Sequence, residues 1–132
     1  MVTLHPMVIL AYFLIFSALG WIIDSAFRSI EDKRLTSGTL IPGISPLYGF
    51  GAVILIMIFS TPTLSVYEKI GLGTAAMILL ELIVGILCAK VLHRRFWDYS
   101  RNKWNIGGYI DLIHCIYWLI LVIAFAQIYT LL

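Results

Sequence analysis

The strongest constraint on the fold is a set of four apolar stretches that together fill most of this 132-residue chain. They cover residues 6–27, 47–61, 70–92 and 112–132. A helix needs roughly 20 residues to cross the hydrocarbon core of a bilayer. Extended backbone exposed to lipid would leave its polar groups unpaired, so each stretch is predicted to be a helix. We therefore expect an all-α polytopic membrane protein, a bundle of four transmembrane helices forming a single domain over residues 1–132.

Composition excludes several other classes of protein. Hydrophobic residues make up 61% of the chain and charged residues 12%, whereas about a quarter of the residues in a soluble domain are charged. The net charge of +2 offers no basic patch for a nucleic acid, so the lipid bilayer is the expected partner. Cys88 and Cys115 lie in apolar runs, and His5, His93 and His114 share no ligand spacing. The sequence therefore predicts no metal and no other cofactor.

The basic residues predict the orientation of the helices. Of the nine Lys and Arg residues, only Lys69 lies in the short connection after the second stretch. The others lie in or beside the two long connections, residues 28–46 and 93–111. Because basic loops stay on the cytoplasmic side, we expect both long loops in the cytoplasm, both termini outside, and the protein in the cell membrane.

An irregular segment, residues 36–51, precedes and begins the second stretch. It holds four glycines and two prolines among apolar residues, so it cannot be one regular helix. One interpretation is a re-entrant segment that packs against the bundle or enters the membrane partway. The other is an ordinary loop followed by a helix that starts at a proline. The sequence leaves both open.

Glu81 is the most informative single residue, because it stands twelve positions from both Lys69 and His93. That spacing corresponds to about 18 Å of helix on either side, which places Glu81 near the middle of the bilayer. A carboxyl group at that depth is expected to face the protein interior and to bind a donor or a proton. A functional role and a role as a polar contact between helices both remain possible.

Three more ionisable residues group at the predicted cytoplasmic side. Asp24 is expected to close the first helix, and Asp111 and His114 to open the fourth, on one helical face. The pair could act as a base with its orienting acid, or as a proton relay. Alternatively, Asp111 is an ordinary acid at a helix start, which the helix dipole favours.

The second long loop carries an aromatic run that is typical of the membrane interface. Interface position does not explain Asp98 and Ser100 between the rings. It also does not explain the stretch from Asn105 to Gly108, where a turn with unusual backbone angles is expected.

Several motifs along residues 12–118 together resemble the ABC-transporter type IV family of CmpB-like membrane proteins. They are Gly20-Trp21 with an acid three residues later, Gly38 and Leu40, Pro46-Leu47-Tyr48-Gly49-Phe50-Gly51, Glu81 with Gly85, Trp97-Asp98-Tyr99-Ser100, and Asn105 with Gly108 and Trp118. The resemblance implies a membrane-embedded transport component. The chain has no G-x-x-x-x-G-K-[ST] motif, so ATP-driven transport would need a separate ATPase subunit.

The leading hypothesis is a small permease-like transport subunit with a polar intramembrane site, working as a homo-oligomer or with a partner membrane subunit. The candidates for substrate binding or proton coupling are Glu81, Asp24, Tyr48, Trp97, Asp98, Asn105, Asp111 and His114. One alternative is a membrane enzyme acting on lipid headgroups, for which no catalytic spacing is recognised. Another is an accessory subunit whose polar motifs hold its own loops.

Overall fold

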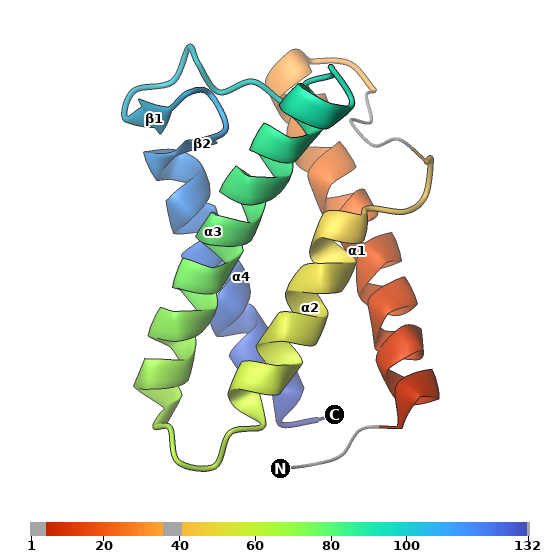
Figure 1. Cartoon of the computed structure of the whole chain (residues 1–132), viewed down its shortest axis with the longest axis vertical. Coiled ribbons are helices and arrows are strands. Elements are labelled where there is room, and N and C mark those ends of the chain that lie inside the picture. Colours follow the sequence, from red (N-terminus) through yellow and green to blue (C-terminus); the bar gives the residue numbers. More distant parts are fainter. Residues whose placement is uncertain (1–4, 36–40, 132) are drawn as a thin grey trace. The chain divides into compact units, whose positions relative to one another are not determined.

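The protein is predominantly helical in a computed structural model, which describes residues 5–35 and 41–131. The helices are α1 (Pro6–Asp32), α2 (Pro46–Phe59), α3 (Val66–Val91) and α4 (Leu112–Tyr129). Two short strands, β1 (Asn105–Ile106) and β2 (Ile110–Asp111), lie between α3 and α4 (Figure 1). α1, α3 and α4 are long and apolar enough to cross a membrane. The all-α prediction is therefore confirmed at the level of secondary structure.

α2 is shorter than the other helices. Its 14 residues extend for about 21 Å, less than the roughly 30 Å of a hydrocarbon core. The expected bundle of four spanning helices is thus supported for three helices, and α2 as a fourth span stays a prediction. Contacts divide the chain into two units, residues 2–53 and 54–132, with the boundary inside α2. Each unit is described by itself below.

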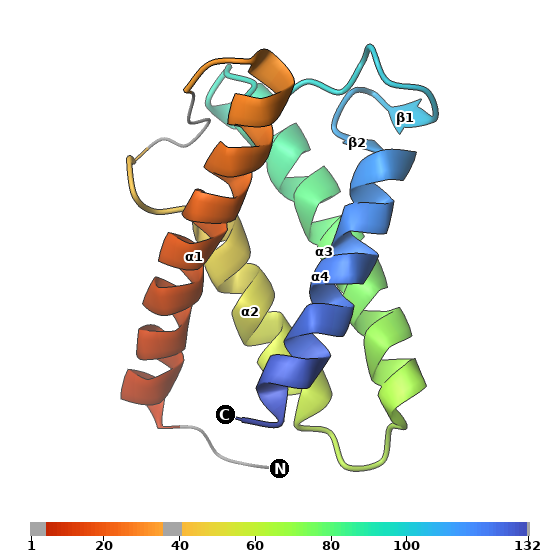
Figure 2. The same cartoon turned by 180° about the vertical axis from the view of Figure 1, so that it is seen from behind.

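In the unit of residues 2–53, the start of α2 packs against the middle of α1 (Figure 2). A Cβ atom on Gly20 would overlap the ring of Tyr48, and one on Gly49 would overlap the side chain of Ser17. The backbone N–H of Ser45 donates to the carbonyl of Ser17 at 3.0 Å. Within the described part of the irregular segment, residues 41–51, buried Ser45 therefore contacts α1 directly before α2 begins at Pro46, whereas Ile41 is 53% exposed. The motif residues Gly38 and Leu40 lie outside the described residues.

In the unit of residues 54–132, α3 and α4 pack side by side (Figures 1 and 2). The buried residues of α3 recur every fourth position and form one face: Gly73, Met77, Glu81 and Gly85. The buried residues of α4 are Trp118, Val122, Phe125 and Ala126. A Cβ atom on Gly73 would lie 3.1 Å from Val122 and 2.8 Å from Leu55, so the missing side chain permits close approach.

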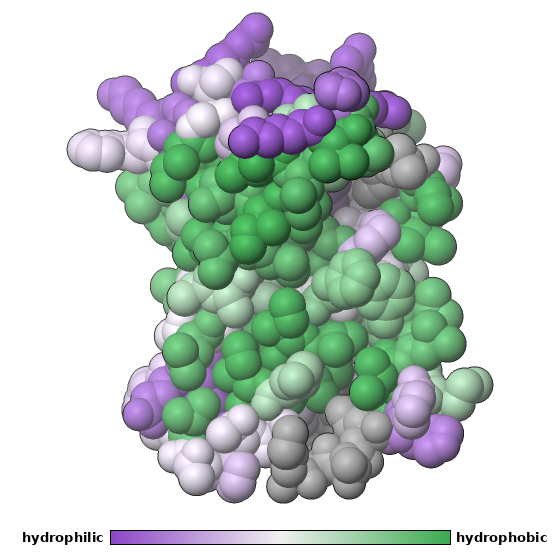
Figure 3. All heavy atoms as spheres, in the orientation of Figure 1, coloured by the Kyte–Doolittle hydropathy of each residue, from purple (hydrophilic) through white to green (hydrophobic). Residues whose placement is uncertain are grey.

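The surface of α3 changes character along its length. Hydrophobic residues cover the middle of the helix in Figure 3, and hydrophilic residues gather at its two ends. The exposed apolar side chains of α3 include Leu79, Ile83 and Leu87. This distribution is what a helix in contact with lipid requires.

The connection from α3 to α4 contains structure that the sequence analysis did not predict. β1 and β2 pair antiparallel, with Asn105 opposite Asp111 and Ile106 opposite Ile110. Gly107 and Gly108 have φ angles of 60° and 76°, a conformation that favours glycine. The predicted turn with unusual backbone angles is therefore confirmed. Asp111 is the last residue of β2 and the N-cap of α4. The loop of residues 93–111 therefore has regular structure at its end and leads directly into the helix.

The first helix is longer than predicted. We expected it to end at residue 27, but α1 continues to Asp32, with Lys33 in the left-handed conformation as its C-cap. Residues 28–32 include no glycine or proline to stop a helix. An ion pair between Asp24 and Arg28, 2.7 Å long and one turn apart, also supports this last stretch. The prediction that Asp24 closes the helix is therefore wrong.

Candidate functional site

Glu81 lies on the buried face of α3 and is only 4% exposed. α3 begins at Val66 and ends at Val91. Glu81 therefore lies in the middle part of the helix, far from both ends. One turn further on, Gly85 has the rings of Tyr109 and Trp97 against it, at 3.0 Å and 3.2 Å from its Cβ position. The carboxyl group is therefore enclosed by protein, with aromatic rings on the side of the loop.

Two aromatic side chains donate hydrogen bonds to this carboxyl group. The Tyr99 hydroxyl donates to Oε1 of Glu81 at 3.0 Å. The indole Nε1–H of Trp118 donates to Oε2. Tyr99 comes from the loop and Trp118 from α4, so Glu81 joins three parts of the unit through one functional group. Hydrogen bonds to charged acceptors are stronger than neutral ones, which offsets part of the cost of burying the acid.

The ring of Tyr99 connects this acid to a second one. It stacks on the imidazole of His114, with ring centroids 3.7 Å apart and an interplanar angle of 14°. His114 Nδ1 lies 2.6 Å from Oδ1 of Asp111. Asn102 also donates to the Asp111 carboxylate. We refer to these six residues as the Glu81 cluster: Glu81, Tyr99, Asn102, Asp111, His114 and Trp118.

Asp111 is 1% exposed and serves as the N-cap of α4, accepting from the backbone N–H of His114 at 2.7 Å. Burial raises the pKa of its carboxyl group, but hydrogen bonds from His114 and Asn102 outweigh burial. The net result is a pKa below the usual value for aspartate. Asp111 therefore stays ionised at neutral pH, with the imidazole of His114 within hydrogen-bond distance of its carboxylate.

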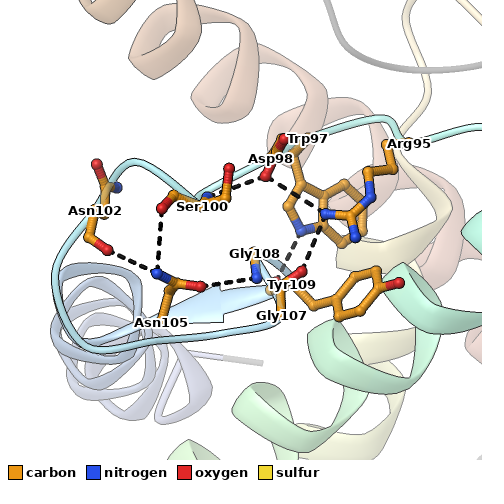
Figure 4. A network of polar contacts seen from close by, with 9 residues as sticks. All are labelled: Arg95, Trp97, Asp98, Ser100, Asn102, Asn105, Gly107, Gly108 and Tyr109. Atoms are coloured by element: carbon orange, nitrogen blue, oxygen red, sulfur yellow. Dashed lines mark hydrogen bonds and ion pairs between the residues drawn. The ribbon is translucent and has the colours of Figure 1, made fainter.

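A second polar group, the loop network, holds the backbone between α3 and α4 (Figure 4). Trp97 Nε1 donates to the carbonyl of Tyr109 at 2.9 Å. Asn105 Nδ2 donates to the carbonyl of Asn102 at 2.8 Å, and Asn105 Oδ1 accepts from the N–H of Gly108 at 2.9 Å. These side chains satisfy backbone groups of their own loop, which is how an irregular segment is stabilised.

Asp98 belongs to the same network. Its Oδ1 accepts from the backbone N–H of Ser100 at 3.0 Å and lies 3.4 Å from Arg95 Nη1. The hydrogen bonds from Ser100 hold the pKa of Asp98 below its usual value, with a smaller contribution from Arg95. Arg95 also donates to the carbonyl of Gly107 at 3.0 Å and lies over the ring of Tyr109. Asp98 is therefore a half-exposed anion that anchors its own turn.

Asn102 joins the two groups, because its carbonyl accepts from Asn105 while its side chain donates to Asp111. The structure thus connects Glu81, Asp111 and His114 within one cluster and supports that cluster with Trp97, Asp98 and Asn105. The other two candidates, Asp24 and Tyr48, belong to the unit of residues 2–53. There Asp24 pairs with Arg28, and the ring of Tyr48 packs over Gly20.

Three members of the Glu81 cluster were missing from the sequence-based candidates: Tyr99, Asn102 and Trp118. For Trp118 a signal existed. An indole N–H inside an apolar helix needs an acceptor, and Glu81 is the acid that the neighbouring apolar stretch contains near its middle. Tyr99 and Asn102 carried no comparable signal, because they stand among several aromatic and polar residues of one loop.

The Glu81 cluster places a buried carboxyl group with two hydrogen-bond donors between the apolar helices α3 and α4. Among the residues described, no group of three or more His, Cys, Asp or Glu side chains could bind a metal ion.

The family model with the description "Putative ABC-transporter type IV" matches residues 11–132. No curated protein and no solved structure matches the chain. The family match agrees with the resemblance based on the motifs from Gly20 to Trp118.

Proposed function

Because the chain belongs to the ABC-transporter type IV family, we propose that it is a permease-like membrane subunit of a transporter. The Glu81 cluster would be its polar intramembrane site. The family and the three long apolar helices support the membrane context and the link to transport. The polar site is our inference from the contacts of Glu81.

The observation that carries this proposal is the burial of Glu81 with donors from two other parts of its unit. A charged side chain at the centre of a membrane helix costs about 2.5 to 3.5 kcal/mol on insertion scales. A helix contact alone could be made by Ser, Thr or Asn at lower cost. The retention of a carboxyl group, surrounded by Tyr99 and Trp118, favours a role that requires its charge or its proton.

The proposed assembly includes further subunits. The sequence contains no motif for nucleotide phosphates, so an ATPase subunit would come from another chain. Four helices in one chain enclose too little space for a solute path, which favours a homo-oligomer or a second membrane subunit. We place the loop of residues 93–111 and the other basic loop on the cytoplasmic side, where an ATPase would bind.

Substitutions of Glu81 test this function in a host strain that lacks the native chain. Solute distributions across the membrane are compared by mass spectrometry in cells complemented with the native protein, Glu81→Gln, Glu81→Leu or Thr74→Val. Thr74 is the matched control, because it is a polar residue of the same helix whose hydroxyl donates to the carbonyl of Ile70 in that helix. We expect at least one solute to respond to the native protein.

For that solute, both Glu81 variants should lose about tenfold or more of the transport rate, whereas Thr74→Val should retain it within about twofold. Retention of transport in Glu81→Gln would indicate a structural contact and not a functional acid. A complete absence of solutes that depend on the native protein would contradict the transport assignment. Co-purification of an ATPase subunit with the tagged native chain would support the proposed assembly.

A specific observation also favours a second candidate, an enzyme that acts on lipid headgroups. Asp111 holds Nδ1 of His114, and the imidazole is partly exposed at the end of α4. This is the arrangement of a base with its orienting acid. Incubation of the purified protein with extracted membrane lipids, followed by mass spectrometry of the headgroups, tests it. Altered headgroups that disappear in His114→Gln would support the enzyme, and unchanged lipids would reject it.

A further inference from the structure

Glu81 accepts hydrogen bonds from two donors that differ in chemistry. A tyrosine hydroxyl can both donate and accept, whereas an indole N–H can only donate. Both donors stabilise the ionised carboxylate in the observed geometry. They respond differently when the carboxyl group takes up a proton, because the new O–H group then needs an acceptor.

We propose that the Glu81 carboxyl group binds and releases a proton at Oε1 and that Tyr99 is the positioning residue that reverses its hydrogen bond in each cycle. This inference rests on the proposed function and names the proton as a substrate of that site. In the ionised state Tyr99 donates to Oε1. When a hydronium ion transfers a proton to Oε1 and leaves as water, the new O–H donates to the Tyr99 oxygen, and the phenolic hydrogen turns away from the carboxyl group.

Oε2 is the less suitable oxygen for the proton. Its partner Trp118 has no lone pair to offer in place of its N–H. A proton on Oε2 would therefore meet a second hydrogen, whereas a proton on Oε1 meets an oxygen that can accept. Trp118 keeps its donation to Oε2 in both states, although the neutral acid is a weaker acceptor than the carboxylate.

The surroundings of Tyr99 allow this reversal without movement of the ring. The ring is held against His114 by stacking, and His114 is held by Asp111 through Nδ1 and through the helix cap. Rotation of a hydroxyl hydrogen needs only a turn about the C–O bond. The phenol can therefore change its role while its oxygen stays close to Glu81.

The titratable groups near Glu81 come from two elements packed on α3. Tyr99 comes from the loop, and its ring leads to His114 and Asp111. Cys115 comes from α4, and the charge of Glu81 acts on it electrostatically. Any titration assigned to Glu81 therefore has to be separated from those of Cys115 and His114, which is done with variants of Glu81 itself.

An infrared titration tests the proposal in the full-length protein, reconstituted in vesicles of phosphatidylcholine and phosphatidylglycerol. The carbonyl band of a protonated carboxylic acid that is lost in Glu81→Gln reports the proton on Glu81. We expect this band to disappear in a single transition as the pH is raised from about pH 4 to about pH 9, and to return when the pH is lowered again. A Glu81 band that does not change over this range would overturn the proposal.

The two donors are then removed one at a time. Trp118→Phe removes a partner that prefers the ionised form, so the midpoint of the band should move upward by about one pH unit. Tyr99→Phe removes a partner that serves both forms, so its midpoint should move by less than half of that shift. An equal or larger shift in Tyr99→Phe would overturn the reversal of the hydrogen bond. Thermal unfolding and size-exclusion chromatography check that each variant is folded.

A second measurement leaves Trp118 intact in case its replacement prevents folding. The indole N–H resonance of Trp118 in a ¹⁵N NMR spectrum should move with the infrared titration, because its acceptor changes from a carboxylate to an acid. In Glu81→Gln the resonance should stay at the position of the protonated state at every pH. A resonance that follows pH in Glu81→Gln as in the native protein would contradict the inference.

The outcomes separate this inference from the proposed function. If Glu81 titrates as expected while Glu81→Gln transports normally, the transport role of the site is wrong and proton binding stands. If Glu81 does not titrate while both Glu81 variants lose transport, the site binds a solute by another chemistry and the proton inference is wrong.

Discussion

The two units of the chain stabilise their helix contacts in different ways. Between α1 and the start of α2, contact depends on missing side chains, with Gly20 under Tyr48 and Gly49 over Ser17. Buried hydroxyl groups there, on Ser17 and Ser25, have no hydrogen-bond partner among the described residues. Between α3, α4 and their loop, nearly every buried polar atom is hydrogen-bonded, including both oxygens of Glu81. Close packing is sufficient to join membrane helices, so the polar cluster indicates a further requirement.

The largest expected effect comes from filling the contact in the first unit. Gly20→Leu places a side chain where the ring of Tyr48 lies, and overpacking of this kind costs about 3 kcal/mol. Thermal unfolding in detergent should show the loss. Gly71→Leu is the matched control, because no atom outside its chain neighbours and the backbone of its own helix lies within 4 Å of a Cβ at this position. Equal stability of both variants would contradict the role of close packing.

A somewhat smaller loss should follow from a side chain at the turn of the loop. In Gly108→Ala the Cβ atom would lie 2.5 Å from Asp98 Oδ1, at a residue with φ of 76°. Steric overlap and backbone strain together should cost about 2 kcal/mol in the free energy of unfolding.

Gly43→Ala separates the two contributions to that loss. Gly43 has a φ of 86° but no neighbour within 4 Å of its Cβ position. The difference between the two variants therefore measures the steric contribution of the loop network. If Gly43→Ala is as destabilising as Gly108→Ala, strain alone accounts for both.

Removal of one side chain of the loop network should have a moderate effect. Asn105→Ala removes the donor to Asn102 and the acceptor for Gly108, at a cost of about 1 to 2 kcal/mol. Asn105→Asp keeps the acceptor and should lose less. Chemical unfolding followed by tryptophan fluorescence measures both variants. A stability of Asn105→Ala equal to that of the native protein would mean that the network holds no part of the fold.

The smallest expected effect is a pH dependence at low pH. Because the pKa of Asp111 is lowered in the folded state, its contribution to stability is complete above its unfolded pKa of about 3.9. That contribution disappears as the pH falls through the folded value. The melting temperature of the native protein should therefore decrease below about pH 4. Asp111→Asn should show a weaker decrease, and identical slopes would contradict the assignment.

Much of the helical structure follows from the sequence for a simple physical reason. A long apolar run in a chain with few charges has one stable form in lipid, so α3 and α4 begin and end within a few residues of their predicted bounds. Helix ends outside the apolar runs depend on local polar interactions. The extension of α1 to Asp32, with the pair of Asp24 and Arg28, therefore went unpredicted.

The candidate site was predictable in part. Glu81 stands out because an acid in an apolar helix is costly. Its partners Tyr99 and Trp118 lie 18 and 37 residues further along the chain. The indole of Trp118 indicates that an acceptor is needed in a neighbouring helix, whereas nothing in the sequence distinguishes Tyr99 from the other aromatic residues of its loop. The β1–β2 pairing is just as hard to foresee, because strands of two residues have no periodicity to detect.

Tyr99 belongs to the loop and not to a helix, so a movement of the loop would also move its hydroxyl group. Its hydroxyl reaches an acid inside α3, but its backbone belongs to the loop, where the N–H of Tyr99 bonds to the carbonyl of Gly108 at 2.8 Å. A displacement of this loop would withdraw the phenol from the carboxyl group. Displacement of the loop would then alter the hydrogen bonding of an acid buried in the protein, with no need for the helices themselves to slide.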